Sequence, residues 1–399
     1  MMNCRYCKKK LSKSFLNIGK SALANSFLKE KINHIKSDLK LFICQNCLLI
    51  QHSINLKSEK IFDEYSYFSS YSKDTLSHSK KFTKEISKFL VSSDNILEIA
   101  CNDGYLLQYF DRRKYELYGV EPAKNVAKIA KKKGIKVFNN YFDLKFSNKL
   151  KNKKFKLIIC NNVFAHIPNI KSFMLGLKNL INDETIVTIE VQYFLTLIRE
   201  NLIDMIYHEH FYYHTIKSLR KIFSEMDLEL FDCKIIETHG GSLRIYISKK
   251  GIRKISHNLS SLIKKEDDYF FKIISKSSNF FQNKFLKYYS QTFKLLKKLT
   301  NKDKVIGFGA AAKCSTLINI FNINSEMIKF VIDDTPYKQG CYIPGSDIKV
   351  LSSKEAKKYE FDTIIIFAWN YLETIRKKIY KEFGFKKTVV LIPKLKILD

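Results

Sequence analysis

Five short apolar segments between residues 95 and 191 constrain the fold of this 399-residue chain more than any other feature. Segments of helical character follow the first and the second of them, at residues 105–110 and 125–133. Strands that alternate with helices form parallel sheets, which bind ligands beyond the carboxyl ends of their strands. The pattern therefore predicts an α/β domain. The apolar segments are residues 96–100, 115–120, 136–138, 157–160 and 185–191.

An acidic residue, Glu121, directly follows the second of these predicted strands. A carboxylate at this position accepts hydrogen bonds from both ribose hydroxyls of a bound nucleotide. The turn after the first strand, from Ala100 to Gly104, lacks the three glycines that a pyrophosphate group requires. S-adenosylmethionine carries a ribose but no phosphate, so this turn suits it better than it suits NAD. A Rossmann-like domain that binds another nucleotide is the alternative.

Four of the nine cysteines form two CxxC pairs near the N-terminus. Each pair can place two thiolates on one Zn²⁺ ion at about 2.3 Å, and two pairs complete a closed tetrahedron. Because no position is left for water, we expect this zinc site to be structural. His34 and His52 lie nearby and are not needed as ligands. The four predicted ligands are Cys4, Cys7, Cys44 and Cys47.

The formal net charge of +31 suggests an anionic partner, but the kind of basic residue argues against nucleic acid. Only 8 of the 70 basic residues are Arg, whereas nucleic-acid readers favour the planar guanidinium group. No apolar run approaches the roughly 18 residues of a membrane span, and the first ten residues do not resemble a signal peptide. We therefore expect a cytoplasmic protein with a small anionic substrate, and composition leaves its oligomeric state open.

Residues 206–214 concentrate histidines and aromatic side chains. A zinc-protease HExxH motif that began at His208 would need a second histidine where the chain has Tyr212. Transfer of a methyl group to carbon needs a base that removes a proton beside a carbonyl, and imidazole has a suitable pKa. The segment therefore predicts a catalytic cluster, with side-chain packing at a domain edge as the alternative.

A second nucleotide-binding pattern lies near the C-terminus. Residues 305–312 form a predicted strand and turn with the spacing G-x-G-x-x-A, and the next strand, 330–332, ends at Asp333. Glycines at this spacing and an acid about 20 residues later are the fingerprint of a dinucleotide site. Taken literally, the pattern predicts an NAD-dependent oxidoreductase that acts on a nucleotide sugar.

Taken together, these segments resemble the nucleotide-sugar C-methyltransferases of deoxysugar biosynthesis. The resemblance extends from Cys4 to about Leu351. The segments that carry it, besides the CxxC pairs, are residues 65–70 (YSYFSS), 98–107 (EIACNDGYLL), 161–168 (NNVFAHIP), 207–210 (YHEH), 239–244 (HGGSLR) and 307–313 (GFGAAAK).

The resemblance implies a three-part architecture and a reaction. Residues 1–63 would form the zinc module, 64–250 a class I methyltransferase domain of Rossmann-like fold, and 251–399 a Rossmann-like domain that binds the nucleotide part of the substrate. The expected reaction is methylation at C3 of a nucleoside-diphosphate-linked 4-keto-6-deoxyhexose. A base removes the C3 proton, and the enediolate then attacks the methyl group of S-adenosylmethionine in line.

The resemblance also implies roles for individual residues. His210 would be the base, Glu209 and Tyr207 would orient it or hold the sugar, and Tyr67 and His166 would line the pocket. Ala100 stands where relatives usually carry glycine. The methyl group of Ala100 would be tolerated at this position if its backbone φ were negative. The predicted cofactor-binding residues are Ala100, Asn102, Gly104, Glu121 and Asn161, and the predicted substrate-binding residues are Ser242, Arg244 and Lys313.

Overall fold

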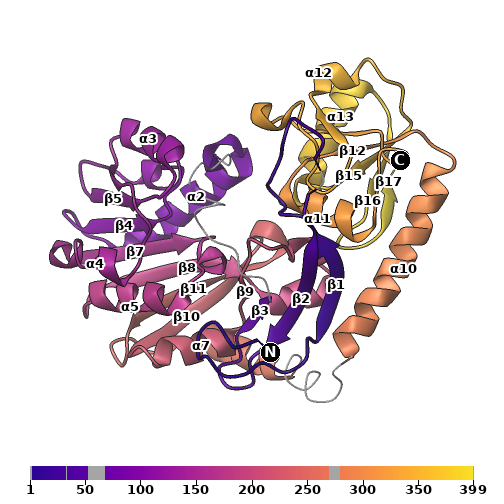
Figure 1. The fold of residues 1–399 in the computed structure, drawn as a ribbon. Helices are drawn as coiled ribbons and strands as arrows, with labels where there is room; N and C mark the ends of the chain where they lie inside the picture. The colour runs from indigo at the N-terminus through magenta and orange to yellow at the C-terminus, as the bar shows by residue number, and fades with distance from the viewer. Residues whose placement is uncertain (1, 33, 53–67, 269–278, 399) are drawn as a thin grey trace.

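The computed structural model describes residues 2–32, 34–52, 68–268 and 279–398, and these residues form three β-sheets (Figure 1). The N-terminal sheet is antiparallel and has the strand order β1-β2-β3-β9. Its last strand comes from the middle of the chain and lies within the histidine-rich segment at residues 206–214. The four strands are β1 (Leu16–Ser21), β2 (Ser37–Ile43), β3 (Ile50–His52) and β9 (Tyr212–Tyr213).

The middle sheet has seven strands in the order β10-β11-β8-β7-β4-β5-β6. The five strands predicted from the apolar segments are mutually parallel, which confirms the predicted α/β fold. Two further strands extend the sheet in antiparallel fashion. The strands are β4 (Asn95–Ile99), β5 (Glu116–Val120), β6 (Lys136–Phe138), β7 (Phe155–Asn161), β8 (Ile186–Gln192), β10 (Leu228–Ile236) and β11 (Ser242–Lys249).

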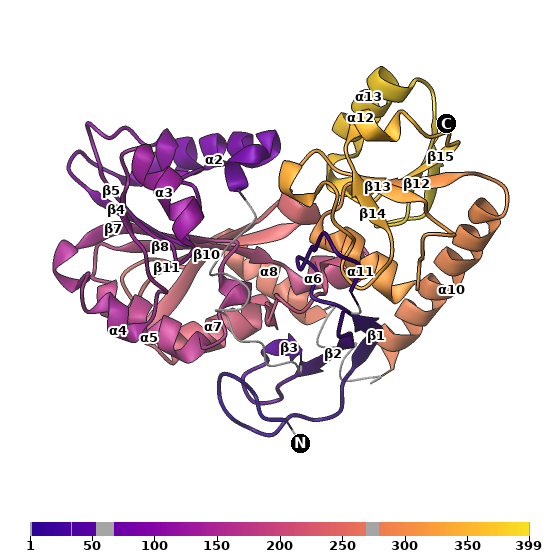
Figure 2. The same ribbon diagram turned by 45° about the horizontal axis from the view of Figure 1, so that its top comes forward.

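Helices cover both faces of the middle sheet (Figures 1 and 2). Phe82 and Ala130, from α2 and α3, pack on one face against Ile96. Phe146 and Phe173, from α4 and α5, belong to the larger core on the opposite face. The helices of this region are α2 (Lys73–Ile86), α3 (Lys124–Lys132), α4 (Leu144–Ser147), α5 (Ile170–Leu180), α6 (Phe194–Arg199), α7 (Ile216–Ser224) and α8 (His257–Glu266).

The helix expected at residues 105–110 is the one local prediction here that was wrong. The structure forms only a 3₁₀ turn, η3 (Leu107–Tyr109), in that place. Apolar spacing predicts that side chains will be buried, but Tyr105, Leu106 and Leu107 are buried without an α-helix. The helix expected at 125–133 is confirmed as α3.

The C-terminal sheet has the order β14-β13-β12-β15-β16-β17 and is parallel except for its last strand. The long helix α10 leads into it along its flank (Figures 1 and 2). Its strands are β12 (Val305–Phe308), β13 (Phe330–Ile332), β14 (Lys349–Leu351), β15 (Thr363–Ile366), β16 (Lys387–Val390) and β17 (Lys396–Leu398). Its helices are α10 (Phe280–Thr300), α11 (Ala312–Ile320), α12 (Ser353–Ala356) and α13 (Leu372–Phe383).

The N-terminal segment contacts the C-terminal sheet region as well as its own sheet. The Tyr342 N–H donates to the Leu28 carbonyl at 2.8 Å, and the Ser315 hydroxyl donates to the Ala24 carbonyl at the same distance. The first β-sheet and its connections therefore join the other two regions. Within the described part of the chain, no helix is both long and apolar enough to cross a membrane.

Candidate active site and metal centre

The four N-terminal cysteines converge on one point. Their sulfur atoms all lie within 4.8 Å of one another, with Cys4 Sγ 3.5 Å from Cys47 Sγ and Cys7 Sγ 3.4 Å from Cys44 Sγ. Zinc bonds of about 2.3 Å place tetrahedral ligands about 3.8 Å apart, so the cluster fits a zinc ion with little adjustment. Four thiolates leave no position for water, and the site is therefore structural.

The two CxxC pairs adopt the same backbone turn. The Lys8 N–H donates to the Cys4 carbonyl and the Leu48 N–H to the Cys44 carbonyl, and both Lys8 and Leu48 have a positive φ, of 63° and 61°. The repeated turn brings both thiols of each pair into the cluster. His52 lies outside the cluster, because its Nε2 bonds the His208 carbonyl at 2.7 Å.

The turn after β4, from Ala100 to Gly104, lies against the carboxylate of Glu121, the residue that follows β5. The Asn102 N–H donates to one carboxylate oxygen at 2.9 Å and the Ala123 N–H to the other at 3.0 Å. Ala100, Asn102 and Gly104 all have a positive φ, of 59°, 48° and 75°. Ala100 therefore lacks the negative φ that would suit its methyl group. Its N–H donates to the Val120 carbonyl at 2.7 Å.

Several buried polar atoms at the carboxyl ends of β4 and β7 lack hydrogen-bond partners among the described residues. They include both amide atoms of Asn161, Oδ1 of Asp103 and Oε2 of Glu98. Burial of a polar group without a partner costs about 1–3 kcal/mol, so their concentration at one edge indicates a polar ligand. Burial raises the pKa of Glu121 to about 7, which also suits a carboxylate that awaits hydroxyl donors.

Glu98 and Asp103 were not selected from the sequence, although both flank the predicted turn. Asp103 Oδ2 accepts the Ser70 N–H at 3.2 Å, and Asn102 Oδ1 accepts the Ser69 N–H at 2.9 Å. The turn therefore also anchors the chain that leads into α2. Acids beside a strand-end turn were the signal that could have identified both residues.

His210 is held by two contacts that determine its tautomer. Its Nδ1 lies 3.2 Å from the Met205 carbonyl and its Nε2 lies 2.6 Å from the Tyr207 hydroxyl. A carbonyl can only accept, so Nδ1 carries the proton and Nε2 is the basic nitrogen. Burial lowers the pKa of His210 well below its usual value, with a further contribution from His166. The ring is therefore neutral and able to accept a proton.

His166 and Glu209 adjoin His210 but do not hold its ring. The His166 ring lies 4.7 Å from the His210 ring, and its Nδ1 donates to the Glu209 carbonyl at 2.8 Å. The Glu209 carboxylate points to the N-terminal segment, where Oε1 accepts the Asn25 N–H at 3.1 Å. Tyr207 contacts the His210 ring and the Glu209 carboxylate does not, and whether either residue orients the base or holds the sugar stays a prediction.

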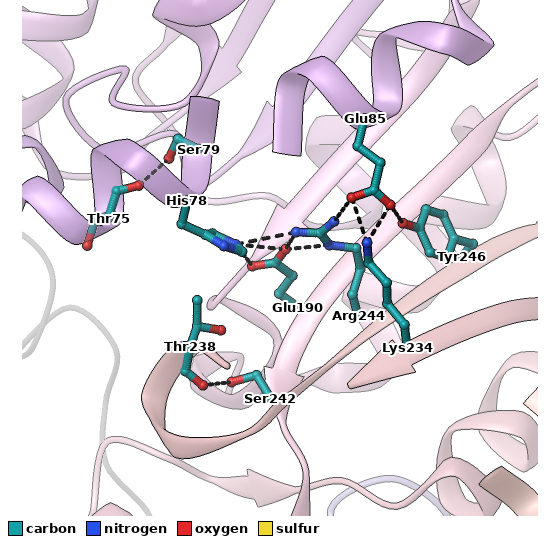
Figure 3. A network of polar contacts seen from close by, with 10 residues as sticks. All are labelled: Thr75, His78, Ser79, Glu85, Glu190, Lys234, Thr238, Ser242, Arg244 and Tyr246. Atoms are coloured by element: carbon teal, nitrogen blue, oxygen red, sulfur yellow. Dashed lines mark hydrogen bonds and ion pairs between the residues drawn. The ribbon is translucent and has the colours of Figure 1, made fainter. Parts of the chain in front are cut away.

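Arg244 lies in a buried network of charges (Figure 3). Its Nε donates to Glu190 at 2.6 Å and its Nη1 donates to Glu85 at 3.0 Å. These bonds tie α2 to β8 and β11. The Ser242 hydroxyl donates to the Thr238 carbonyl at 3.0 Å. The side chains of Arg244 and Ser242 therefore make their hydrogen bonds within the protein, and their contact with a substrate stays a prediction.

Lys313 is buried between the middle and C-terminal regions. Its ammonium group donates to Asn370 at 2.7 Å and lies 4.4 Å from the centre of the Trp369 ring. The indole N–H of Trp369 donates in turn to Asp204 at 2.6 Å. Burial lowers the pKa of Lys313 to about 8 and raises that of Asp204 to about 6. A contact of Lys313 with a diphosphate stays a prediction.

Comparison with known proteins decides the chemistry. Three family models match the chain: a putative zinc binding domain at residues 4–62, a methyltransferase domain at 71–232 and a C-methyltransferase C-terminal domain at 237–393. C-methyltransferase NovU from Streptomyces niveus is 24% identical over 407 residues, which cover 99% of this chain and 96% of NovU. The chain is an S-adenosylmethionine-dependent C-methyltransferase.

Solved structures also resemble parts of this methyltransferase. A methyltransferase from Clostridium acetobutylicum ATCC 824 is 15% identical, with a TM-score of 0.34, and covers 43% of this chain and 91% of its own. Magnesium protoporphyrin IX methyltransferase from Synechocystis PCC 6803, solved with bound S-adenosylmethionine, is 12% identical with a TM-score of 0.31. That match covers 45% of this chain and 79% of the Synechocystis protein.

The C-terminal fingerprint of the methyltransferase is packed against protein. A Cβ atom on Gly309 would lie 2.7 Å from the Ala368 methyl group, and the Ala310 carbonyl accepts the Lys338 ammonium group at 2.9 Å. Ala310 itself is fully buried. The turn is thus packed closely against Ala368 and Lys338, and the comparisons with known proteins give the oxidoreductase alternative no support. The predicted pocket residue Tyr67 lies outside the described residues.

Proposed function

We propose that the enzyme methylates C3 of a nucleoside-diphosphate-linked 4-keto-6-deoxyhexose. The observation that carries this proposal is His210, a buried neutral imidazole whose tautomer leaves Nε2 as the base. A C–H group next to a ketone is a weak acid. Its deprotonation needs such a positioned base, together with a hydrogen-bond donor to the ketone oxygen, which becomes negative.

The chain offers that donor beside the base. The Tyr207 hydroxyl lies 2.6 Å from His210 Nε2. In the proposed reaction this hydroxyl turns to the ketone oxygen of the substrate, while Nε2 takes the proton from the adjacent carbon. Glu209 Oε2 is buried and has no hydrogen-bond partner among the described residues, so it can accept a sugar hydroxyl. Bound S-adenosylmethionine supplies the methyl group.

The cofactor and the nucleotide occupy different regions in this proposal. Glu121, Asn161 and the turn from Ala100 to Gly104 hold S-adenosylmethionine at the middle sheet, where the unpartnered polar atoms lie. Lys313, at the start of α11, lies between the middle and C-terminal regions, on the side proposed for the diphosphate. The boundaries 1–63, 64–250 and 251–399 remain proposals, since β9 belongs to the N-terminal sheet.

Isotope transfer tests the proposal directly. The enzyme is incubated with methyl-labelled S-adenosylmethionine and a panel of nucleotide-linked sugars, some with a 4-keto group and some reduced at C4. We expect label on C3 of a 4-keto sugar and none on its 4-hydroxy counterpart, because only the ketone acidifies the C3 proton. Label on oxygen or nitrogen, or equal transfer to the reduced sugar, would contradict a C3 carbanion mechanism.

A further inference from the structure

The segment with the proposed base is built into the sheet of the zinc module. Strand β9 begins two residues after His210 and pairs with β3, with Gln51 opposite Tyr212 and Ile50 opposite Tyr213 (Figure 1). Strand β3 is itself the neighbour of β2 in that sheet. The zinc module and the YHEH motif at residues 207–210 are therefore one continuous piece of structure.

Strand β3 also connects the motif to a metal ligand. The Gln51 amide donates to Cys4 Sγ at 3.3 Å, and its carbonyl oxygen accepts the Arg5 N–H at 2.9 Å. The next residue, His52, bonds the His208 carbonyl through Nε2 at 2.7 Å. Gln51 and His52 are both fully buried. The backbone of the motif thus lies two short side-chain contacts away from the zinc site.

A second connection runs through residues 22–25, which follow β1 and which we call the strap. The Ala22 carbonyl lies 3.3 Å from His208 Nδ1. The Asn25 N–H and side-chain amide both approach Glu209 Oε1, at 3.1 and 3.4 Å. On the strap's other side, the Ala24 carbonyl accepts the Ser315 hydroxyl of α11. The strap therefore holds the motif against the C-terminal region.

The two carboxylate oxygens of Glu209 have different surroundings. Oε1 accepts both donors of Asn25, whereas Oε2 is buried with no partner among the described residues. A buried carboxylate oxygen without a donor is unfavourable unless a ligand provides one. Among the described residues, the titratable groups that face Glu209 are Tyr213, whose pKa the charge of Glu209 helps to raise, and His166, whose ring donates to the Glu209 carbonyl.

We propose that the zinc module is a working part of the active site, in which Asn25 is a positioning residue that holds Glu209 Oε1 and so presents Oε2 to a hydroxyl or amine donor of the substrate. This inference rests on the proposed function, because it requires a substrate beside Glu209. It assigns the N-terminal region a part in substrate recognition in addition to metal binding.

The substitution Asn25→Asp tests the proposal with little change of size. It replaces an amide donor with a second carboxylate that faces Glu209, and like charges raise the pKa of a carboxyl group. We expect KM for the sugar to rise at least about tenfold, as for a lost hydrogen bond to a charged group, and the acidic limb of the pH profile to move to higher pH. Asn25→Ala retains the backbone N–H, so its KM should rise less and its pH profile should not move.

Asn3→Asp is the matched control, because Asn3 is an exposed residue of the same module. It should leave KM, the pH profile and zinc content at their wild-type values. Zinc content and S-adenosylmethionine affinity should also stay unchanged in Asn25→Asp, which separates a positioning role from loss of the fold. Wild-type KM and pH profile in Asn25→Asp would overturn the proposal, and if that variant does not fold, wild-type KM in Asn25→Ala would overturn it.

Glu209→Gln separates failure of this inference from failure of the proposed function. If Glu209→Gln is impaired and the Asn25 variants are not, the carboxylate acts without the strap and only the inference fails. If Glu209→Gln itself has wild-type kinetics, the assignment of Glu209 to the substrate fails and the inference fails with it.

Discussion

The turn after β4 and the turn after β12 occupy the same place in two parallel sheets, yet their surroundings differ. The β4 turn, from Ala100 to Gly104, lies among buried polar atoms that lack partners within the described residues. The β12 turn, at Gly309 and Ala310, carries the better glycine fingerprint but is packed closely against Ala368 and Lys338. Unsatisfied polar atoms at the strand ends indicate a ligand site more reliably than glycine spacing, because spacing does not report what fills the turn.

Loss of the proposed base should give the largest effect. His210→Asn keeps a side chain of similar polarity but removes the basic Nε2, and general bases contribute about 10²–10⁴-fold to rate. We expect methyl transfer and solvent exchange of the C3 proton to fall together by such a factor, as measured by mass spectrometry in deuterated water.

His208→Asn is the control for that measurement, since the His208 ring contacts the Ala22 carbonyl of the strap. It should reduce exchange less than His210→Asn does. Exchange at the wild-type rate in both variants would place the base elsewhere, with His166 as the next candidate because its ring adjoins that of His210.

Gly309→Ala tests how closely the turn after β12 is packed. Gly309 has a φ of +92° and no room for a methyl group, so we expect a loss of about 3 kcal/mol in the free energy of unfolding. Gly251→Ala is the control, with a φ of +78° and, apart from its chain neighbours, no atom within 4 Å of the added methyl group, and should lose about 1 kcal/mol. Urea unfolding measures both.

Ligand titrations on the same variant complete this test. S-adenosylmethionine affinity should be the same in Gly309→Ala as in the wild type, since its proposed site is on the other sheet. If NAD stabilised the wild-type protein against urea but not the variant, the C-terminal turn would be a dinucleotide site and the contrast between the two turns would be lost.

The pH dependence of cofactor binding tests the middle sheet. Burial raises the pKa of Glu121 to about 7 from the usual 4.5, so folding favours its protonated form. Its contribution to stability is therefore complete below pH 4.5 and is lost as the pH rises through 7. Ribose hydroxyls favour the ionised form, so S-adenosylmethionine should bind about tenfold more tightly at pH 8 than at pH 6.

Calorimetric titration at pH 6, 7 and 8 checks this trend. Glu121→Gln cannot ionise, so its affinity should be weaker at pH 8 and nearly independent of pH over this range. A pH dependence that survives in Glu121→Gln would belong to another group, and the assignment of the ribose to Glu121 would then have to be given up.

The smallest expected effect concerns Ala100. Its φ of +59° is the left-handed region, which costs a residue with a Cβ atom about 1 kcal/mol relative to glycine. Ala100→Gly should therefore raise the free energy of unfolding by about 1 kcal/mol, whereas Ala130→Gly, within helix α3, should lower it by a similar amount or more. An equal loss in both variants would show that the turn is not strained at Ala100.

Much of this molecule could be predicted because its signals are local. The strands of the middle sheet, the CxxC pairs and the acid after β5 each depend on residues that are close in the sequence, where apolar periodicity and ligand spacing act directly. The helix expected after Gly104 was wrong for the same reason, since burial of Tyr105 and Leu107 can be achieved without an α-helix.

What only the tertiary structure decided depends on residues that are far apart. Asn25 and Glu209 are 184 positions apart and meet because β9 joins the N-terminal sheet. The sequence alone determined the strands of the middle sheet and the chemical groups at their ends, since backbone preference and side-chain period act over a few residues. The positive φ of Ala100, the ion pairs of Arg244 and the close packing of the turn at Gly309 depend on contacts between elements that are far apart in the sequence, which local patterns do not specify.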